Sequence, residues 1–583
     1  MMKTTREQEH IIQVRGDAKI NAVAGSGKTT TLIELAKTRP KSHRILYLAF
    51  NKSVKTEALV KFAKAGLNQV KIETAHSMAY RAVVPKNNYE VSNQGYKHSE
   101  LVEVLGLSSS GKNFTEYILA DHVLRYSALF CNKTTSSIAE LDYLSTISDP
   151  KAKAFAKNHF GAIQKLTRVF MAKMNEGSIP ITHDFYLKKF QLSKPVLPYD
   201  MILFDEGQDA SPVMLNIFLN QDAEKIIVGD SHQQIYSWRF AENALETTKF
   251  PSYSLSQSFR FSDEIADLAN KVLALKSQLG RKLDLSIKGL KDPPLKEGQK
   301  AIIARTNLGL LKRAIELVYE GKEVEKIYFE GNFNSYTYAD SGTSLYDVLS
   351  LYQGRKNKIR DKLIKRMPDM QGLEEYIKKT GDIQLSMMAE IVRKYKSKIP
   401  KILKTIKDSH LKDSDKPKAE IIFSTVHRAK GMEYEEVELI PDFLTEENLN
   451  SILEEGELNP LDRNKLNEEI NLLYVAITRT RGKLKLHESL VPEGFKANKY
   501  VEVILDEESK DADFFELEEN GYSEIRKKHK LAYRPWTPEQ DEELTILFCE
   551  GARVKEIAEH FGRTHGAIRS RIKKLELLEL YGS

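Results

Sequence analysis

The stretch KINAVAGSGKTTTL, residues 19–32, decides the fold. Its apolar beginning predicts a buried strand, and GSGKT at 25–29 predicts a tight loop followed by the start of a helix. Glycines let backbone N–H groups close around an anion, and a helix N-terminus adds partial positive charge. Lys28 can reach the outer phosphates of a nucleotide, and Thr29 can hold Mg²⁺. The stretch favours a nucleotide triphosphate site over a simple glycine-rich turn, although Ala22 stands where the full pattern has glycine.

Length and composition set the outer limits. The 583 residues exceed what one core usually holds, about 250 to 300 residues, so we expect several domains. A net charge of +6 permits a nucleic-acid partner without requiring one. Cys131 and Cys549 lack neighbours at metal-ligand spacing, which indicates neither a disulfide framework nor a zinc site. No apolar leader or long apolar run occurs, so we expect a cytoplasmic protein with no membrane partner.

A second strand ends in two acids. The segment YDMILFDEGQD, residues 199–209, predicts a strand that delivers Asp205 and Glu206 at its C-terminal end. Ligands of doubly wound sheets gather at that edge. One carboxylate can hold Mg²⁺ and its neighbour can polarise an attacking water. Acidic pairs are also common in turns, so the prediction depends on the phosphate loop lying nearby.

A further strand, EKIIVGD at 224–230, leads to Gln233, whose amide could sense a γ-phosphate. Trp238 follows, flanked by Tyr236 and Arg239. A tryptophan after a strand is commonly a core residue, but these neighbours also suit a platform on which bases stack.

These segments and several others resemble, in order, the motifs of superfamily 1 DNA helicases of the UvrD/Rep type. The matching segments are Gln8, the loop at 24–30, FNK at 50–52, TAHS at 74–77, DEGQD at 205–209, GDSHQQIYSWR at 229–239, SQSFRFSDEIADLAN at 256–270, ARTN at 304–307, STVHRAKGMEYEEVELI at 424–440 and EEINLLYVAITRTRGKLKL at 468–486. The resemblance implies an α/β protein with two RecA-like P-loop NTPase domains that carry helical insertions.

The resemblance also implies ATP and Mg²⁺ as cofactors and assigns their contacts. Thr29 and Asp205 would hold Mg²⁺, Glu206 would activate water, and Arg260 and Arg479 would stabilise the transferred phosphoryl group. Gln8 would recognise adenine, Phe259 would stack on it, and Glu433 would contact the ribose. The full set of expected ATP contacts is Gln8, Ala24, Gly25, Ser26, Gly27, Lys28, Thr29, Thr30, Phe259, Arg260, Glu433 and Arg479, with Glu206 and Gln233 as further catalytic residues.

On the nucleic-acid side, the resemblance assigns single-stranded DNA contacts to Phe50, His76, Trp238 and His427. It also implies 3′→5′ movement along one strand and binding at junctions of single- and double-stranded DNA. Thr30 stands where many relatives have an arginine that packs on the adenine, so we expect relaxed selectivity for the nucleotide base.

The expected domains follow from the motif positions. A first RecA-like domain would span residues 1–250, with a helical insertion at about 85–195. A second would span 251–344 and 413–490, interrupted by a reduced inserted helical domain at 345–412. Residues 491–532 would form a linker, because the composition from 506 onward swings from acidic to basic.

Residues 533–583 predict a small all-α domain of three helices that resembles a Myb-like or helix-turn-helix module. Pro538 and Gln540 mark the first helix start, and VKEIAEHF at 554–561 predicts the second. The third carries basic residues away from its apolar face, which favours duplex DNA binding over a protein-interaction module. The expected DNA contacts there are Arg563, Arg569, Arg571 and Lys573.

Two functions remain open from the sequence. The first is an ATP-driven DNA helicase and translocase. The second is a DNA-stimulated ATPase switch within a repair, mobile-element or defence complex, with a protein partner and little unwinding alone. The intact set of motif residues favours the first, and the short insertion at 345–412 favours the second. A DNA-binding regulator with vestigial ATPase motifs is disfavoured, because no catalytic position is lost.

Overall fold

The computed structural model describes residues 4–92, 94–107, 115–147, 150–281, 283, 285–336, 344–380, 383–454, 456–505, 538–549, 552, 554–561, 563, 568 and 571–572. The chain divides into two compact units. The first comprises Met1–Phe259, Asp284–Ile287 and Leu458–Asn471, and the second comprises Arg260–Leu283, Lys288–Glu457 and Leu472–Ser583.

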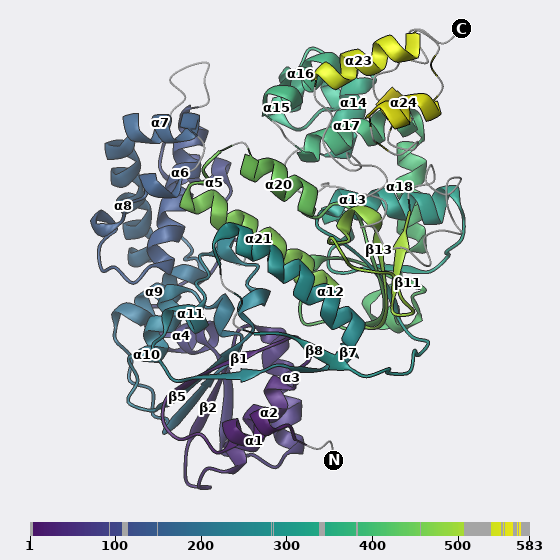
Figure 1. The fold of residues 1–583 in the computed structure, drawn as a ribbon. Helices are drawn as coiled ribbons and strands as arrows, with labels where there is room; N and C mark the ends of the chain where they lie inside the picture. Colours follow the sequence, from purple (N-terminus) through teal and green to yellow (C-terminus); the bar gives the residue numbers. More distant parts are fainter. Residues whose placement is uncertain are drawn as a thin grey trace. The chain divides into compact units, whose positions relative to one another are not determined.

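The first unit is built on a six-stranded sheet in the order β3-β2-β4-β5-β1-β6, whose neighbouring strands all pair in parallel (Figure 1). Its strands are β1 Ala18–Ala22, β2 Ile45–Ala49, β3 Val70–Thr74, β4 Met201–Phe204, β5 Glu224–Gly229 and β6 Ser252–Leu255. The apolar runs predicted as strands are therefore strands, and parallel pairing brings their carboxyl ends to one edge.

Both faces of this sheet are buried. Strand β2 shows why, because all five of its residues are buried and they alternate between two hydrophobic clusters. Tyr47 packs with Leu32, Leu35 and Phe62 on one face, and Leu48 belongs to the cluster on the other. The helices of this unit are α1 Arg6–Ile12, α2 Lys28–Lys37, α3 Lys52–Lys64, α4 Ala75–Val83, α5 His98–Val104, α6 Thr115–Asn132, α7 Pro150–Asn158, α8 Phe160–Glu176, α9 His183–Leu192, α10 Pro212–Leu219 and α11 Ala244–Thr247.

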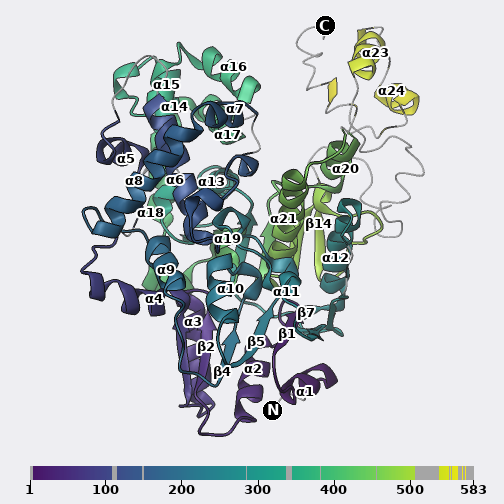
Figure 2. The same ribbon diagram turned by 90° about the vertical axis from the view of Figure 1, so that its left-hand side faces the viewer.

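The segment between β3 and β4 is helical, from α4 to α9. In both views α6 and α8 lie on one side of α9 and the strands lie on the other (Figures 1 and 2). Buried residues of these helices, such as Tyr126 and Phe170, share one hydrophobic cluster with Phe204 of the sheet. The insertion is thus packed onto the sheet through a continuous core.

The second unit has its own six-stranded parallel sheet in the order β10-β11-β9-β12-β13-β14. Its strands are β9 Lys300–Ala304, β10 Ile327–Phe329, β11 Ile421–Thr425, β12 Tyr434–Leu439, β13 Thr480–His487 and β14 Val501–Ile504, and a separate two-stranded sheet joins β7 Gln257–Ser262 to β8 Lys288–Leu290. Its helices are α12 Asp263–Ala274, α13 Asn307–Ala314, the π-helix η8 Ile315–Glu320, α14 Leu345–Tyr352, α15 Lys362–Arg366, α16 Met370–Thr380, α17 Ile383–Tyr395, α18 Ile399–Ser409, α19 Val426–Ala429, α20 Glu446–Glu454 and α21 Pro460–Ile477, whose first part clusters with the first unit.

The inserted helices α14 to α18 share a core with this sheet. Val348, Val392 and Ile406 belong to the same cluster of buried residues as Ile302 of β9 and Phe423 of β11. Ion pairs add to this packing, since Lys312 Nζ of α13 lies 2.8 Å from a carboxylate oxygen of Glu390 in α17. The insertion and the sheet therefore form one packed body.

Three predicted boundaries are wrong. Strand β6 follows residue 250 but pairs with β1, so the first unit extends beyond the predicted end. The predicted linker begins too early, because β14 pairs in parallel with β13 and its Val501 is buried. Residues 458–471 cluster with the first unit, although they were assigned to the second domain. In each case strand pairing or packing between distant segments overrides chain order.

Near the C-terminus, α23 Pro538–Cys549 begins at the predicted proline and α24 Val554–Phe561 matches the predicted second helix. Leu544, Ile557 and Phe561 form a small core with Ile568 and Ile572. The rest of the predicted third helix lies outside the described residues, so the three-helix domain stays a prediction. Among the described residues, no helix is long and apolar enough to cross a membrane.

Candidate active site

The loop between β1 and α2 has the geometry of an anion-binding turn. Gly25 and Gly27 have φ angles of 74° and 78°, which glycine adopts without strain. A Cβ atom at Gly27 would come within 3.2 Å of Gln8 Nε2. The loop is also hydrogen-bonded to β7, because Phe259 N donates to Gly25 O at 2.8 Å. The turn therefore holds the N-terminus of α2 in a fixed place at the sheet edge.

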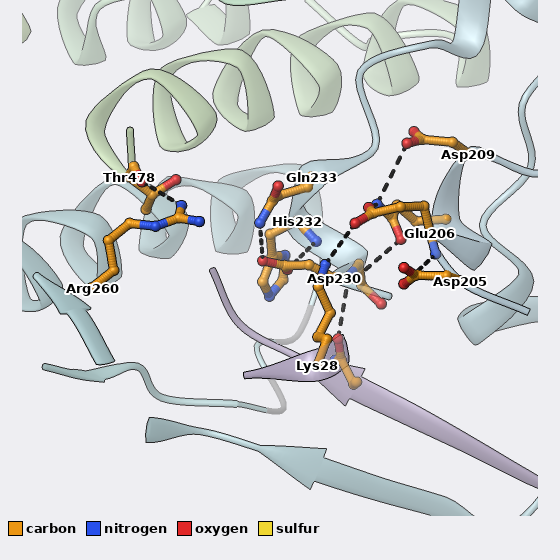
Figure 3. Close-up of polar contacts among 12 residues, drawn as sticks. Lys28, Asp205, Glu206, Asp209, Asp230, His232, Gln233, Arg260 and Thr478 are labelled. Atoms are coloured by element: carbon orange, nitrogen blue, oxygen red, sulfur yellow. Dashed lines mark hydrogen bonds and ion pairs between the residues drawn. The ribbon is translucent and has the colours of Figure 1, made fainter. Parts of the chain in front are cut away.

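Lys28 at the start of α2 is paired with an acid. Its Nζ lies 3.0 Å from Glu206 Oε1, and both side chains are largely buried (Figure 3). Burial alone would lower the pKa of Lys28, but the carboxylates of Glu206, Asp205 and Asp230 outweigh it and raise that pKa. The lysine therefore remains a cation in a site lined by carboxylates.

Asp205 follows β4 directly and lies beside this pair. Its Oδ1 accepts from Glu206 N at 2.9 Å, and its Oδ2 accepts a hydrogen bond from the Tyr47 hydroxyl. Burial, and then the charge of Glu206, raise the pKa of Asp205 to about 6, with Lys28 opposing them. Burial and the adjacent Asp205 raise the pKa of Tyr47 well above its ordinary value, so the phenol stays protonated.

A chain of polar contacts links Glu206 to the turn after β5. Gln208 is fully buried; its Nε2 donates to Glu206 Oε2 at 2.5 Å, and its Oε1 accepts from Asp230 N at 3.1 Å. Asp230 Oδ2 in turn accepts from Gln233 Nε2 at 2.8 Å (Figure 3). Glu206 itself has a φ of 55°, a costly conformation for a residue with a side chain. The structure thus brings together Lys28, Asp205, Glu206 and Gln233.

The residues present fit ATP and a divalent cation. The buried hydroxyl of Ser26 has no hydrogen-bond partner among the described residues, and a phosphate oxygen in the loop would supply one. Thr29 and Asp205 offer oxygen donors, which Mg²⁺ prefers. When bound there, the cation would neutralise phosphate charge.

Of the remaining predicted ATP contacts in the first unit, Gln8 is buried rather than solvated. Its Oε1 accepts from Thr5 N at 2.9 Å in a capping box, and its Nε2 donates to Thr31 Oγ1 at 3.3 Å. These bonds fix its amide beside the loop. Ala24 is buried in the loop and Thr30 is exposed at the start of α2.

In the second unit, Arg260 is paired with Glu433, a predicted ribose contact. The guanidinium also donates to Thr478 O at 2.8 Å. Arg481 shares the same carboxylate, with its Nε donating to Glu433 Oε2 at 2.7 Å. Burial would raise the pKa of Glu433, but Arg260 and Arg481 outweigh burial and lower it. The acid therefore holds two guanidinium groups.

Arg479 is enclosed within the second unit and is only 1% exposed. Its Nε donates to Val475 O at 2.9 Å and its Nη2 donates to Thr478 Oγ1 at 3.1 Å. In this conformation the guanidinium satisfies the C-terminal end of α21. A role on a phosphoryl group would require the side chain to leave these partners.

The predicted DNA contacts of the first unit include an aromatic pair. Phe50, after β2, stacks on Tyr236, after β5, with ring centroids 5.9 Å apart and planes 24° apart. The Arg239 guanidinium lies 5.9 Å from the Tyr236 centroid. Trp238 lies in the same turn, at Ser237–Arg239, but its side chain is outside the described residues.

The two predicted histidine contacts lie in different units. His76, in α4, has its Nε2 3.8 Å from Asp184 Oδ1 and packs edge-on against Tyr186. Burial would raise the pKa of Asp184, but hydrogen bonding and charge from His76 outweigh it and lower that pKa. His427 lies in α19 of the second unit and is partly exposed.

One predicted contact of the C-terminal module is wrong. Arg563 is only 1% exposed, and its Nη2 donates to Gln540 Oε1 at 3.2 Å, so the helices enclose it instead of presenting it to phosphates. Arg571 is partly exposed. Arg569 and Lys573 lie outside the described residues.

The sequence analysis missed three residues of these sites. Gln208 lies inside a quoted motif, so its position was a usable signal. Arg481 lies two residues after Arg479 in a quoted motif and was passed over. Tyr47 gave no such signal, because a tyrosine within an apolar strand is indistinguishable from a core residue.

Comparison with protein families matches residues 4–250 to the UvrD/REP helicase N-terminal domain and residues 323–489 to the UvrD-like helicase C-terminal domain. Together these matches cover most of the chain and all strands of the two six-stranded sheets except β6, β9 and β14. The chain belongs to the UvrD-like helicase family. Membership makes this chain a helicase-family enzyme and implies use of a nucleotide with a metal ion.

Individual relatives agree with this assignment. The chain is 30% identical over 532 residues to F-box DNA helicase 1 of Gallus gallus, covering 84% of this chain and 49% of the relative. It is 28% identical over 535 residues to F-box DNA helicase protein 1 of Schizosaccharomyces pombe, covering 83% and 57%. A probable DNA helicase of Mycoplasma pneumoniae is 22% identical, with 84% of each chain covered. The chain spans about half the length of the two F-box relatives.

Proposed function

We propose that this UvrD-like chain is an ATP-driven DNA helicase and translocase that moves 3′→5′ on single-stranded DNA. The observation that carries the proposal is the Lys28–Glu206 pair beside Asp205, at the sheet edge that also holds the glycine loop. A cation, two acids and a phosphate-binding turn at one edge are the groups that hydrolysis of a nucleotide triphosphate requires. The direction of movement rests on resemblance alone.

Each residue then has a proposed task. Lys28 binds the outer phosphates, Thr29 and Asp205 hold Mg²⁺, and Glu206 accepts a proton from the attacking water. When ATP binds, Lys28 would leave Glu206 and contact the phosphate instead. This exchange frees the Glu206 carboxylate to act as a base. Arg260 and Arg479 supply positive charge to the transferred phosphoryl group. Gln8, Phe259 and Glu433 recognise the nucleoside.

The contacts of Gln208 and Asp230 offer a route from hydrolysis to DNA within the first unit. They connect Glu206 to the turn after β5, and this turn continues to Tyr236, which stacks on Phe50. A base stacked on these rings would bias the position of the turn and, through it, of Glu206. DNA is therefore proposed to stimulate turnover. His76, Trp238 and His427 are the remaining proposed contacts to single-stranded DNA.

The decisive experiment is ATP-dependent separation of matched duplexes that carry either a 3′ or a 5′ single-stranded tail. We expect opening of the 3′-tailed duplex only, and no opening by the Lys28→Ala variant. Opening of the 5′-tailed duplex alone would overturn the direction. Opening by Lys28→Ala would overturn the proposed site.

A second candidate is a DNA-stimulated ATPase switch that unwinds little by itself and works with a protein partner. The packing of α14 to α18 favours it, because their described buried residues share one hydrophobic core with the second sheet. This candidate predicts DNA-stimulated hydrolysis without strand separation on either tailed duplex. Addition of a partner would then restore opening.

We also propose that the C-terminal helices bind duplex DNA through Arg569, Arg571 and Lys573 and that the protein acts in the cytoplasm at junctions of single- and double-stranded DNA. Removal of residues 533–583 should weaken duplex affinity and reduce its dependence on salt. Unchanged affinity would favour a protein-interaction module.

A further inference from the structure

Tyr47 is a buried phenol that the proposed mechanism does not use. It lies in β2, is fully buried, and packs edge-on against Phe62 with ring centroids 5.1 Å apart. Its hydroxyl does not end in the apolar core, because it donates to Asp205 Oδ2. The hydroxyl thus contacts Asp205, one of the two proposed metal ligands.

Strand pairing explains how the phenol reaches Asp205. Strands β2 and β4 run in parallel with Tyr47 opposite Leu203, and Asp205 N donates to Leu48 O at 3.1 Å. Tyr47 points to the face of the sheet covered by α2, whose first turn carries Thr29. A tyrosine is long enough to bridge from the middle of β2 to the end of its neighbour, whereas a leucine or phenylalanine would leave the carboxylate without this donor.

The two oxygens of Asp205 are restrained from different directions. Oδ1 accepts from Glu206 N at 2.9 Å and Oδ2 accepts from the phenol. Each carboxylate oxygen can accept more than one bond, so each keeps a lone pair for a metal ion or its water. Donors behind a metal-binding carboxylate fix its rotation and tune its affinity.

We propose that Tyr47 is a positioning residue that orients Asp205 for the divalent cation and thereby sets the affinity of the site for that metal. This inference rests on the proposed function of the β1–α2 turn. Tyr47 is fully buried and its hydroxyl bonds to Asp205, so its removal should act through Asp205 and the metal.

The test compares full-length Tyr47→Phe with wild type and with Tyr126→Phe. Tyr126 is a matched control, because it is also fully buried and its hydroxyl donates to Ile138 O at 2.8 Å away from the proposed site. Binding of Mn²⁺ in the presence of ADP is measured by electron paramagnetic resonance. Binding of ADP in EDTA is measured in parallel, and circular dichroism verifies that each variant is folded.

We expect the Mn²⁺ dissociation constant of Tyr47→Phe to rise about 10- to 100-fold, with ADP affinity in EDTA unchanged. Tyr126→Phe should match wild type in both measurements. An unchanged Mn²⁺ affinity in Tyr47→Phe would overturn the proposal. Equal losses in both variants, or a parallel loss of ADP affinity in EDTA, would also overturn it by showing a general packing effect.

A double variant adds a measurement that is independent of folding. If the phenol acts through the carboxylate, Tyr47→Phe should add little to the Mn²⁺ affinity lost in Asp205→Asn. Additive losses would overturn the proposal. The Lys28→Ala variant separates this inference from the proposed function: ADP affinity that does not depend on Lys28 overturns the nucleotide site itself, whereas unchanged Mn²⁺ affinity with that dependence intact overturns only the role of Tyr47.

Discussion

The turn after β1 and the turn after β9 have the same strand-turn-helix arrangement but differ in what can bind their backbone N–H groups. Each follows a strand inside a six-stranded parallel sheet and leads into a helix. The first is a glycine loop whose buried Ser26 hydroxyl has no partner among the described residues. The second is filled by the protein, because Asp442 accepts from Arg305 N at 2.7 Å and from Thr306 N at 2.9 Å.

Backbone N–H groups at the start of a helix attract an anion, and either a ligand or a side chain can supply it. Asp442 supplies it in the second unit and also accepts from the Thr306 hydroxyl at 2.9 Å. The difference teaches that the shared strand-turn-helix geometry does not by itself make a nucleotide site. The glycines and the neighbouring charges do.

The largest effect should come from Arg260 of the second unit, which we propose to act on the transferred phosphoryl group. Arg260→Ala should lower ATP turnover by about 10³- to 10⁵-fold, as loss of a phosphoryl-stabilising arginine does. Arg481→Ala is the matched control, because it removes the other guanidinium from Glu433. Phosphate release under saturating ATP measures both. Equal losses of turnover in the two variants would show that they act through Glu433 and not through a direct contact of Arg260 with the phosphoryl group.

Next come the residues of the glycine-loop edge. Lys28→Ala and Glu206→Gln should each reduce hydrolysis by at least about 10²- to 10³-fold, as removal of one charge-stabilising group does. Glu206→Gln should retain ATP binding, since it keeps the shape of the side chain. Steady-state turnover and nucleotide affinity are the measurements. Turnover at the wild-type rate in either variant would remove that residue from the catalytic set.

A smaller loss is expected at the aromatic pair. Phe50→Ala should weaken single-stranded DNA binding by about 1 to 3 kcal/mol, the value of one base stacked on an aromatic ring. Tyr346→Ala provides a control at an exposed tyrosine of α14. Fluorescence anisotropy of a labelled oligonucleotide measures the affinity. If both variants bind as wild type does, the Phe50–Tyr236 pair is structural.

Asp442→Ala tests the filled turn directly. It should lower the free energy of unfolding by about 1 to 3 kcal/mol, because it leaves two partly buried N–H groups without this acceptor, and it should not change ATP affinity. Asp415→Ala removes a partly exposed acid that pairs with an exposed lysine, and it should cost less. Urea unfolding and nucleotide titration separate the two quantities. A fall in ATP affinity would mean that the second turn also takes part in nucleotide binding.

The smallest effect concerns Glu73, an acid that is paired with Lys55 and Arg81. Burial would raise the pKa of Glu73, but hydrogen bonds from Lys55, Ser77 and Arg81 outweigh it and lower that pKa to about 2 from 4.5. The unfolded chain then binds more protons between these values, so stability present above pH 4.5 is lost as pH falls toward 2. The urea midpoint should therefore fall less for Glu73→Gln than for wild type between pH 6 and pH 3.5, about the upper part of that window. Equal falls would contradict the shift.

The sequence predicted much of the proposed site because its parts are local. An apolar run, a glycine loop and a lysine at fixed spacing predict β1, the turn and the start of α2, and the acids after β4 follow the same logic. The pairing of Lys28 with Glu206 was also within reach, because parallel strands bring their carboxyl ends together. The family resemblance added residues such as Arg260 and Glu433, which no local pattern distinguishes.

By itself, then, the sequence determined the strands, the glycine turn and the residue types at the sheet edge, since these depend on neighbours a few positions apart. Tertiary structure decided that β6 belongs to the first sheet and β14 to the second. It also decided that Arg563 is enclosed and that Tyr47 reaches Asp205, which is 158 positions away in the chain. Alternation along a strand shows only that side chains face two sides. Which strand lies alongside, and in what register, is set by packing between distant segments.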